Sequence, residues 1–441
     1  MNISPKPLDE PSKQADDLVG LSHLPLANKI HTLTNAIARK KPRYNMNGLV
    51  EENLGSWILH NLGHIRFRKF GPYPDYTQFL EENGVYPLQT KNDTGEITIS
   101  LLSDWASDTE EAMRIADMAG IQDYSIHMGD TYYTGSASEI ADNFDDEKGA
   151  AWKYGNIGSF AMLGNHEMYS GGDSYFTSLL PFMGLYYGDD RKPKIKQKAS
   201  FFCLENNFWR IIALDTGYDS LKGIFRTGNN HLELGDKQIA WLTNIVFANP
   251  ADKRGIIFLS HHQPHSAFEG EFRKPIEALT PLIGSNRNVL WFCGHEHRMA
   301  MYGISPLKWN SGYYLRCIGH AGMPVEFKNV ERSDRNLVLY DARVKRTINR
   351  FILKDIQIGH NGFVVLRLHN ELLTADYYDD DRDPGPLQTN VSAKKLVTEQ
   401  WKIDLQSGKL TGISISDLTA GNEEQKQLRK VQRAEQAIGK Q

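Results

Sequence analysis

Apolar runs that end abruptly in polar, chemistry-bearing residues recur through the middle of the chain. Continuous apolar runs of this length, bounded by turn residues, are typical of buried strands. Ligand sites in open sheets lie off the carboxyl ends of the strands, so these endings mark the first place to look for a functional site. The runs are EITISLLSD (96–104), YSIHMGD (124–130), SFAMLGNHE (159–167), GIIFLSHH (255–262) and NVLWFCGHEH (288–297).

Segments with helical spacing lie between these predicted strands. In DTEEAMRIADMAG, Asp108 can cap a helix with an acidic first turn, and Gly120 can end it. Residues 236–249, DKQIAWLTNIVFAN, show a second helical pattern, whereas residues 199–217 predict a hairpin that turns at ENN. Strands alternating with helices indicate a layered core of sheets and helices.

The two ends of the chain differ from this middle part. Residues 1–95 predict an N-terminal, largely helical extension, with helical patterns in LANKIHTLTNAIARKK and LVEENLGSWILHNLGHI. From about residue 345 the pattern is purely β, and the pair Asn361-Gly362 predicts a hairpin joining RFILKDIQI to FVVLRLHN. A last hairpin is predicted from KLVTEQWKIDL and KLTGISI. We therefore expect a main domain over residues 96–418 and a charged tail over residues 419–441.

Composition and charge exclude some classes of protein. The chain has 441 residues, 40% of them hydrophobic and 24% charged, which is typical of a soluble globular protein. Its formal net charge of −4 gives no reason to expect nucleic acid as a partner. We find no apolar run near the ~20 residues of a membrane span and no secretory signal. With 3 cysteines and no signal, a cytoplasmic protein without a disulfide framework is expected. The basic clusters ARKKPR and RFRKF leave open a contact between the N-terminal extension and a membrane surface or a partner protein.

The polar endings together offer the donor set of a metal centre. Two cations ~3.5–4 Å apart can hold the attacking and leaving oxygens of an in-line displacement. Such a pair needs a bridging carboxylate because like charges repel, and Asp130 is the natural bridge. Imidazoles suit zinc and iron at the remaining positions. The donors are Asp104, Asp130, Asn165, His261, His262, His295 and His297, with His166 and Glu167 beside them.

The order Asp…Gly-Asp…Gly-Asn-His-Glu…His…Gly-His-x-His, over roughly residues 96–300, resembles the calcineurin-like metallophosphoesterase superfamily. The resemblance implies an α+β fold, a four-layer α/β/β/α sandwich of two mixed β-sheets flanked by helices. It also implies hydrolysis of a phosphate monoester or diester by a hydroxide that bridges two metal ions. The alternative is a catalytically decayed scaffold or interaction protein that still binds metal.

One family position departs from the expected pattern. The first motif normally reads Asp-x-His, whereas Ala106 stands at the histidine position here. The blocks SDWA and GDTYY resemble the purple acid phosphatase branch, in which a tyrosinate binds a ferric ion. The resemblance therefore implies that Tyr133 replaces the histidine, with Tyr132 as the alternative, and that the two metals are iron paired with iron, zinc or manganese.

Carried over residue by residue, the resemblance implies two metal sites and a catalytic histidine. His262 fits the family's His-x-Pro block, with His261 the alternative, because only one of two neighbours on a strand can point at the metals. His166 would protonate or stabilise the leaving oxygen, with Glu167 or another carboxylate orienting it. The implied ligands are Asp104, Asp130, Tyr133 and His297 for the first metal, and Asp130, Asn165, His262 and His295 for the second.

Overall fold

The computed structural model describes residues 70–76, 83–186, 192–220, 232–332, 335–348, 355–380 and 393–417. The predicted helices at 26–41 and 49–65 and the charged tail at 419–441 lie outside these residues. Within the part of the chain that is described, no helix is long and apolar enough to cross a membrane.

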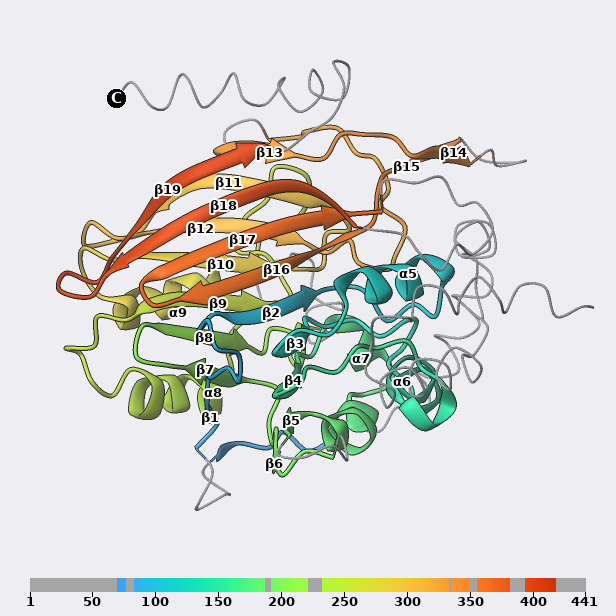
Figure 1. Cartoon of the computed structure of the whole chain (residues 1–441), viewed down its shortest axis with the longest axis horizontal. Coiled ribbons are helices and arrows are strands. Elements are labelled where there is room, and N and C mark those ends of the chain that lie inside the picture. The colour runs from blue at the N-terminus through green and yellow to red at the C-terminus, as the bar shows by residue number, and fades with distance from the viewer. Residues whose placement is uncertain are drawn as a thin grey trace, which may run out of the picture.

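Two mixed β-sheets stacked face to face form the centre of the fold (Figure 1). A separate two-stranded ribbon consists of β14 (Arg346–Ile348) and β15 (Ile356–Ile358). The 8-stranded sheet has the spatial order β1 (Val85–Pro87), β7 (Phe202–Glu205), β8 (Trp209–Leu214), β9 (Gly255–Ser260), β10 (Asn288–Cys293), β12 (Gly312–Ile318), β11 (Met299–Pro306) and β13 (Leu337–Tyr340). The 9-stranded sheet has the order β19 (Lys409–Asp417), β18 (Lys394–Asp404), β17 (Leu372–Asp379), β16 (Gly362–His369), β2 (Ile97–Leu102), β3 (Tyr124–His127), β4 (Gly158–Ala161), β5 (Gly184–Leu185) and β6 (Ile195–Lys196).

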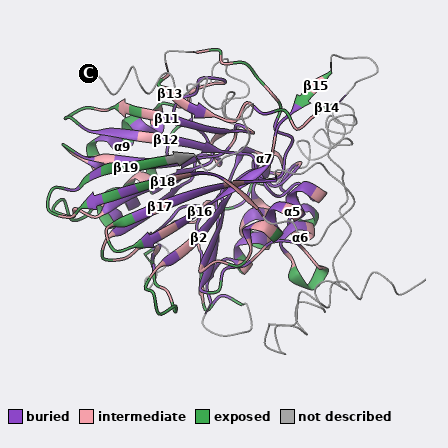
Figure 2. Ribbon diagram, turned by 45° about the horizontal axis from the view of Figure 1, so that its top comes forward, coloured by how far each residue is buried: buried purple, intermediate pink, exposed green. Residues whose placement is uncertain are grey.

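The main hydrophobic core lies between the two sheets. The central strands are buried on both faces, which explains why they read as continuous apolar runs rather than alternating ones (Figure 2). Fully buried residues such as Ile99 on β2, Phe160 on β4 and Leu259 on β9 belong to this core. Packing between the sheets therefore fixes the relative positions of the strand ends.

Helices pack on part of the outer face of each sheet and form the outer layers of the fold (Figure 1). On the 8-stranded sheet, α8 (Asp236–Trp241) and α9 (Lys274–Ile283) pack through a second apolar cluster. On the 9-stranded sheet, a third cluster includes side chains of α5 (Glu110–Ala119), α6 (Ala137–Phe144) and α7 (Asn165–Tyr169). The short helical turns are η2 (Asp146–Lys148), η3 (Tyr175–Leu179), η4 (Leu180–Phe182) and η7 (Leu242–Val246).

Two local predictions were wrong, although the hairpins β7–β8 and β18–β19 are confirmed. Thr109 rather than Asp108 caps α5, because its hydroxyl accepts the N–H of Ala112 at 3.1 Å. The turn at Asn361-Gly362 does not close a hairpin, since β15 pairs with β14 while β16 pairs with β2 and β17.

One strand of the core comes from the segment that was predicted to be an extension. β1, within residues 1–95, pairs in parallel with β7 at the edge of the 8-stranded sheet. The two-sheet core therefore includes residues before 96.

Candidate metal centre

The carboxyl ends of several strands meet at one end of the stacked sheets. β2, β3 and β4 run parallel in one sheet, and β9 and β10 run parallel in the other. Parallel strands end at the same edge, so the residues that follow them come together as the sequence predicted. These residues are Asp104 after β2, Asp130 after β3, Asn165 after β4, His261 and His262 after β9, and His295 and His297 after β10.

Asp130 lies at the centre of this cluster and is buried. Its Oδ1 accepts the backbone N–H of His166 at 2.9 Å. Its Oδ2 lies 3.2 Å from Nε2 of His261 and 3.1 Å from the hydroxyl of Tyr132. Asp130 also has a φ of 68°, a conformation that is uncommon for residues other than glycine and that clusters at functional sites. One carboxylate therefore faces donors from both sheets.

Asp104 supplies a second, fully buried carboxylate. Its Oδ1 accepts the hydroxyl of Tyr132 at 2.8 Å and lies 3.5 Å from Nε2 of His297. Its Oδ2 accepts the hydroxyl of Ser103 at 2.7 Å and the backbone N–H of His295 at 3.0 Å. Oδ1 is thus the oxygen that faces the phenol and the imidazole.

The structure brings Tyr132, rather than the preferred Tyr133, into the cluster. The hydroxyl of Tyr132 contacts both carboxylates and lies 2.9 Å from Nε2 of His297. Tyr133 instead packs against Tyr132 and Met323, and its backbone N–H is held by the carboxylate of Glu139 in the capping box of α6. The path of the loop after Asp130, pinned by that capping box, decides which of the two phenols faces the donors.

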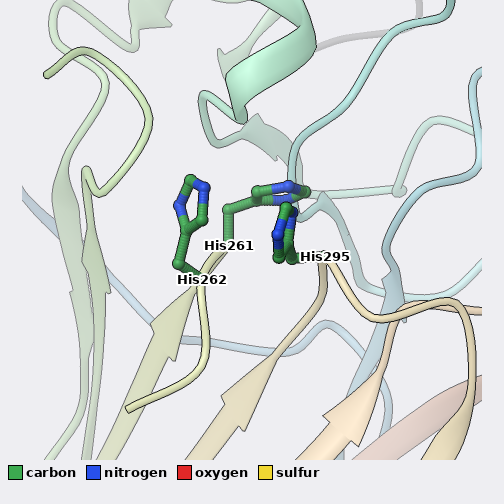
Figure 3. Close-up of side chains that lie close together, drawn as sticks. All are labelled: His261, His262 and His295. Atoms are coloured by element: carbon green, nitrogen blue, oxygen red, sulfur yellow. The ribbon is translucent and has the colours of Figure 1, made fainter. Parts of the chain in front are cut away.

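Both histidines of the pair after β9 lie close to His295 (Figure 3). Ring nitrogens of His261, His262 and His295 lie within 4.8 Å of one another. The argument from strand alternation does not decide between His261 and His262, because β9 ends at Ser260, before both of them.

His261 has the contacts expected of a metal-binding histidine. Its Nε2 lies 3.2 Å from Oδ2 of Asp130 and 3.2 Å from Oδ1 of Asn165, while Nδ1 contacts a main-chain carbonyl at 3.0 Å. A carbonyl at one ring nitrogen fixes the tautomer and leaves the other nitrogen as a ligand. The Nδ1 of His262 lies 3.1 Å from the hydroxyl of Thr216, a neighbour that the sequence analysis missed. The only signal for Thr216 was its position just after another strand, β8.

His166 and Glu167 are not paired as predicted. The Oε2 of Glu167 accepts the backbone N–H groups of Asp130, at 3.2 Å, and Gly164, at 2.9 Å. Glu167 therefore stabilises the turn into α7 instead of orienting His166. The carbonyl of Tyr133 holds Nδ1 of His166 at 2.7 Å, and Nε2 lies 3.8 Å from Oδ2 of Asp130. A main-chain carbonyl, not a carboxylate, sets the ring's orientation.

Glycines give these side chains the space they occupy. A Cβ at Gly164 would lie 2.2 Å from Oδ1 of Asp130, and one at Gly294 would lie 1.8 Å from Oγ of Ser103. Any larger residue would displace Asp130 itself at position 164, or Ser103 and the carboxylate of Asp104 at position 294.

The two buried carboxylates of the cluster are stabilised by nearby positive charge. Burial alone would raise the pKa of Asp130, but His261 and His166 hold it well below its usual range. Burial would lower the pKa of His261, yet Asp130 and Asp104 raise it to about 10. The pKa of Tyr132 is raised well above 10 by burial and by the same two carboxylates. A cation would take over the stabilising role of the proton on His261 and would favour ionisation of the phenol.

The donor set fits metal ions on these grounds. Asp104, Asp130 and His261 offer ligand atoms within 4.8 Å of one another, as do the three histidines off β9 and β10. The carboxylates come from one sheet and the imidazoles from the other. A two-sheet sandwich with this cluster at its strand ends has the donors that a metal-dependent hydrolase needs.

Comparison with known proteins agrees with this class. Residues 97–299 match the family model of the calcineurin-like phosphoesterases. Over these residues, which include the whole candidate metal centre, the chain is similar to this family. Comparison with curated proteins gives no match.

Two solved structures match the chain at low sequence identity. Purple acid phosphatase PPD1 from seeds of yellow lupin (Lupinus luteus) is 15% identical, with a TM-score of 0.42 over 76% of this chain and 58% of that chain. Vps29 from Chaetomium thermophilum is 8% identical, with a TM-score of 0.27 over 70% of this chain and 98% of that chain. The chain thus spans 58% of the length of the lupin protein.

Proposed function

We propose that the chain hydrolyses phosphate esters with two metal ions that share the carboxylate of Asp130. The hydroxyl of Tyr132 carries the proposal, because it contacts both carboxylates and His297 and can supply the donor that Ala106 lacks. The decayed-scaffold alternative rested on that missing donor. The proposed ligands are Asp104, Asp130, Tyr132 and His297 for the first metal, and Asp130, Asn165, His261 and His295 for the second.

The donor types suggest which metals these are. The first site combines two carboxylates, a phenol and one imidazole, a set that suits a hard, highly charged cation such as ferric iron. The second offers two imidazoles and an amide oxygen, which suit iron, zinc or manganese. When bound, the two cations supply a water molecule of lowered pKa and neutralise charge on the phosphoryl oxygens.

His166 is the proposed acid or hydrogen-bond donor to the leaving oxygen. Its Nδ1 is engaged by the carbonyl of Tyr133, so Nε2 is the nitrogen left for a substrate. The ring lies between Tyr132 and Tyr169, with centroid distances of 4.3 and 4.9 Å, which restricts its rotation. The side chain keeps 16% of its surface exposed, so solvent or substrate can reach it.

The two tyrosines provide a matched test of the first site. Protein loaded with ferric iron should show a pink to violet charge-transfer band from a bound phenolate. Tyr132→Phe should abolish the band and the hydrolysis of p-nitrophenyl phosphate or bis-p-nitrophenyl phosphate, whereas Tyr133→Phe should keep both. The opposite result would restore Tyr133 as the ligand, and a colourless ferric protein would exclude a tyrosinate site altogether.

The two neighbouring histidines test the second site in the same way. His261→Ala should reduce the bound metal from two ions to about one and abolish turnover, because His261 contacts both Asp130 and Asn165. His262→Ala should keep two metal ions. Equal metal loss in both variants would show that both histidines are ligands.

Substrate and cellular context need separate measurements. The relative rates on the mono- and diester substrates decide between phosphomonoesterase and phosphodiesterase activity. No turnover in protein shown to hold two metal ions would favour the scaffold alternative. A cytoplasmic location, and contact of residues 1–95 with a membrane surface or a partner protein, stay predictions.

A further inference from the structure

A loop outside the matched family segment lies directly against the first metal site. It comprises residues 319–323 and follows β12. The N–H of Ala321 donates to the carbonyl of Ser103, and the N–H of Met323 donates to that of Asp104, each at 3.1 Å. The Met323 side chain packs against Tyr132. The loop therefore contacts the main chain of one proposed ligand and the ring of another.

Asn361, which directly precedes β16, holds this loop in place. It is 1% exposed, and its Nδ2 donates to the carbonyl of His320 at 3.0 Å and to that of Met323 at 2.8 Å. Two carbonyl acceptors facing one side chain require two N–H donors, which an asparagine amide supplies and a carboxylate does not.

Asn361 is itself fixed by the strand end beside it. Its backbone N–H donates to Oδ1 of Asp380 at 3.2 Å, and its carbonyl accepts the N–H of Asp380 at 3.0 Å. Asp380 directly follows β17 in the 9-stranded sheet. The amide therefore ties the loop at the site to the rigid sheet rather than to another loop.

We propose that Asn361 is a positioning residue for the first metal site. The inference rests on the proposed function, because it takes Asp104 and Tyr132 as ligands. Asn361 acts through Met323, which sets the distance between the phenol and the Asp104 carboxylate. This role accounts for an Asn-Gly pair that does not form the hairpin its sequence predicts.

Asn361→Asp removes both donors with almost no change in shape. A carboxylate oxygen then faces the carbonyl oxygens of His320 and Met323. Because these oxygens repel one another, the loop and Met323 move away. Loss of a partner that orients metal ligands typically weakens metal binding or activity ~10–100-fold. Asn361→Ala removes the same donors without adding charge.

Asn370→Asp is the matched control. Asn370 is an exposed asparagine at the other end of β16, in the turn to β17, and it undergoes the same chemical change. All variants are studied as the full chain loaded with ferric iron and zinc. The measurements are the phenolate charge-transfer band, the affinity of the first site by competition with a chelator, and kcat and KM separately.

We expect both Asn361 variants to shift or weaken the band and to bind the first metal ~10–100-fold less tightly. Their kcat should fall while KM changes little, and Asn370→Asp should match the wild type. A wild-type band and affinity in both Asn361 variants would overturn the inference and leave the proposed function intact. Failure of both variants to fold would assign Asn361 to the fold alone and also overturn it. Wild-type protein without the band would overturn the proposed function and, with it, this inference.

Discussion

Replacing His127 with leucine should make the protein less sensitive to acid. His127 is fully buried on β3, and neither ring nitrogen has a hydrogen-bond partner in the part of the chain that is described. Its ring packs against Trp105, Phe144 and Trp152, with centroid distances of 6.4, 5.1 and 5.7 Å. Burial lowers the pKa of His127 from 6.5 to about 3, although nearby carboxylates oppose the shift.

The sign and size of the effect follow from this difference in pKa. Because the folded value lies below the unfolded one, His127 takes up a proton on unfolding at any pH between them. The wild type keeps its full stability above pH 6.5 and loses this contribution progressively as the pH falls toward 3. At about 1.4 kcal/mol per pH unit, the free energy of unfolding should be about 2 kcal/mol lower at pH 5 than at pH 7 on account of this one group.

Urea unfolding at pH 7 and at pH 5, followed by tryptophan fluorescence, measures the contribution of His127 to the free energy of unfolding. Leucine conserves the buried volume and carries no titrating proton. Between pH 7 and pH 5, His127→Leu should lose about 2 kcal/mol less than the wild type. His369→Leu, at an exposed position at the end of β16, should behave like the wild type. The reasoning is refuted if the wild type and His127→Leu lose equal stability over this interval.

Two further substitutions test the packing of the fold. Gly164→Ala would place a Cβ 2.2 Å from Oδ1 of Asp130, so we expect at least ~10-fold weaker metal binding in folded protein, measured by chelator competition. Glu399→Leu leaves the buried guanidinium of Arg316 without its carboxylate, which lies 2.6 Å from it, and should lower the free energy of unfolding by ~3–5 kcal/mol in urea. Unchanged metal affinity in the first case, or unchanged stability in the second, would contradict the packing argument.

The sequence predicted the gathering of the site because strand ends are a property of the whole sheet. Each apolar run is buried on both faces, and parallel strands must finish at a common edge. Asp104 and Asp130 therefore meet whatever the loops between their strands do. His295 and His297 arrive from the second sheet by the same rule, since the core between the sheets fixes the separation of the two edges.

Two arguments from the sequence do not extend beyond the strand ends. Strand alternation was applied to His261 and His262, but β9 ends at Ser260, so the two rings are placed by the turn and not by the pleat. Glu167 or another carboxylate was expected to orient His166, yet the carboxylate of Glu167 accepts the backbone N–H groups of Asp130 and Gly164. In both cases the local backbone structure determines where the side chain lies.

The two tyrosines show why spacing alone cannot place a side chain in a loop. Counting residues from Asp130 favoured Tyr133, the position at which the related branch has its tyrosine. The carboxylate of Glu139 accepts the N–H groups of Tyr133, Thr134 and Ser136, so the start of α6 fixes the path of this loop. Along that path the phenol of Tyr132 reaches the buried carboxylates. The place of each tyrosine in this loop therefore depends on the contacts that cap α6, which a residue count does not include.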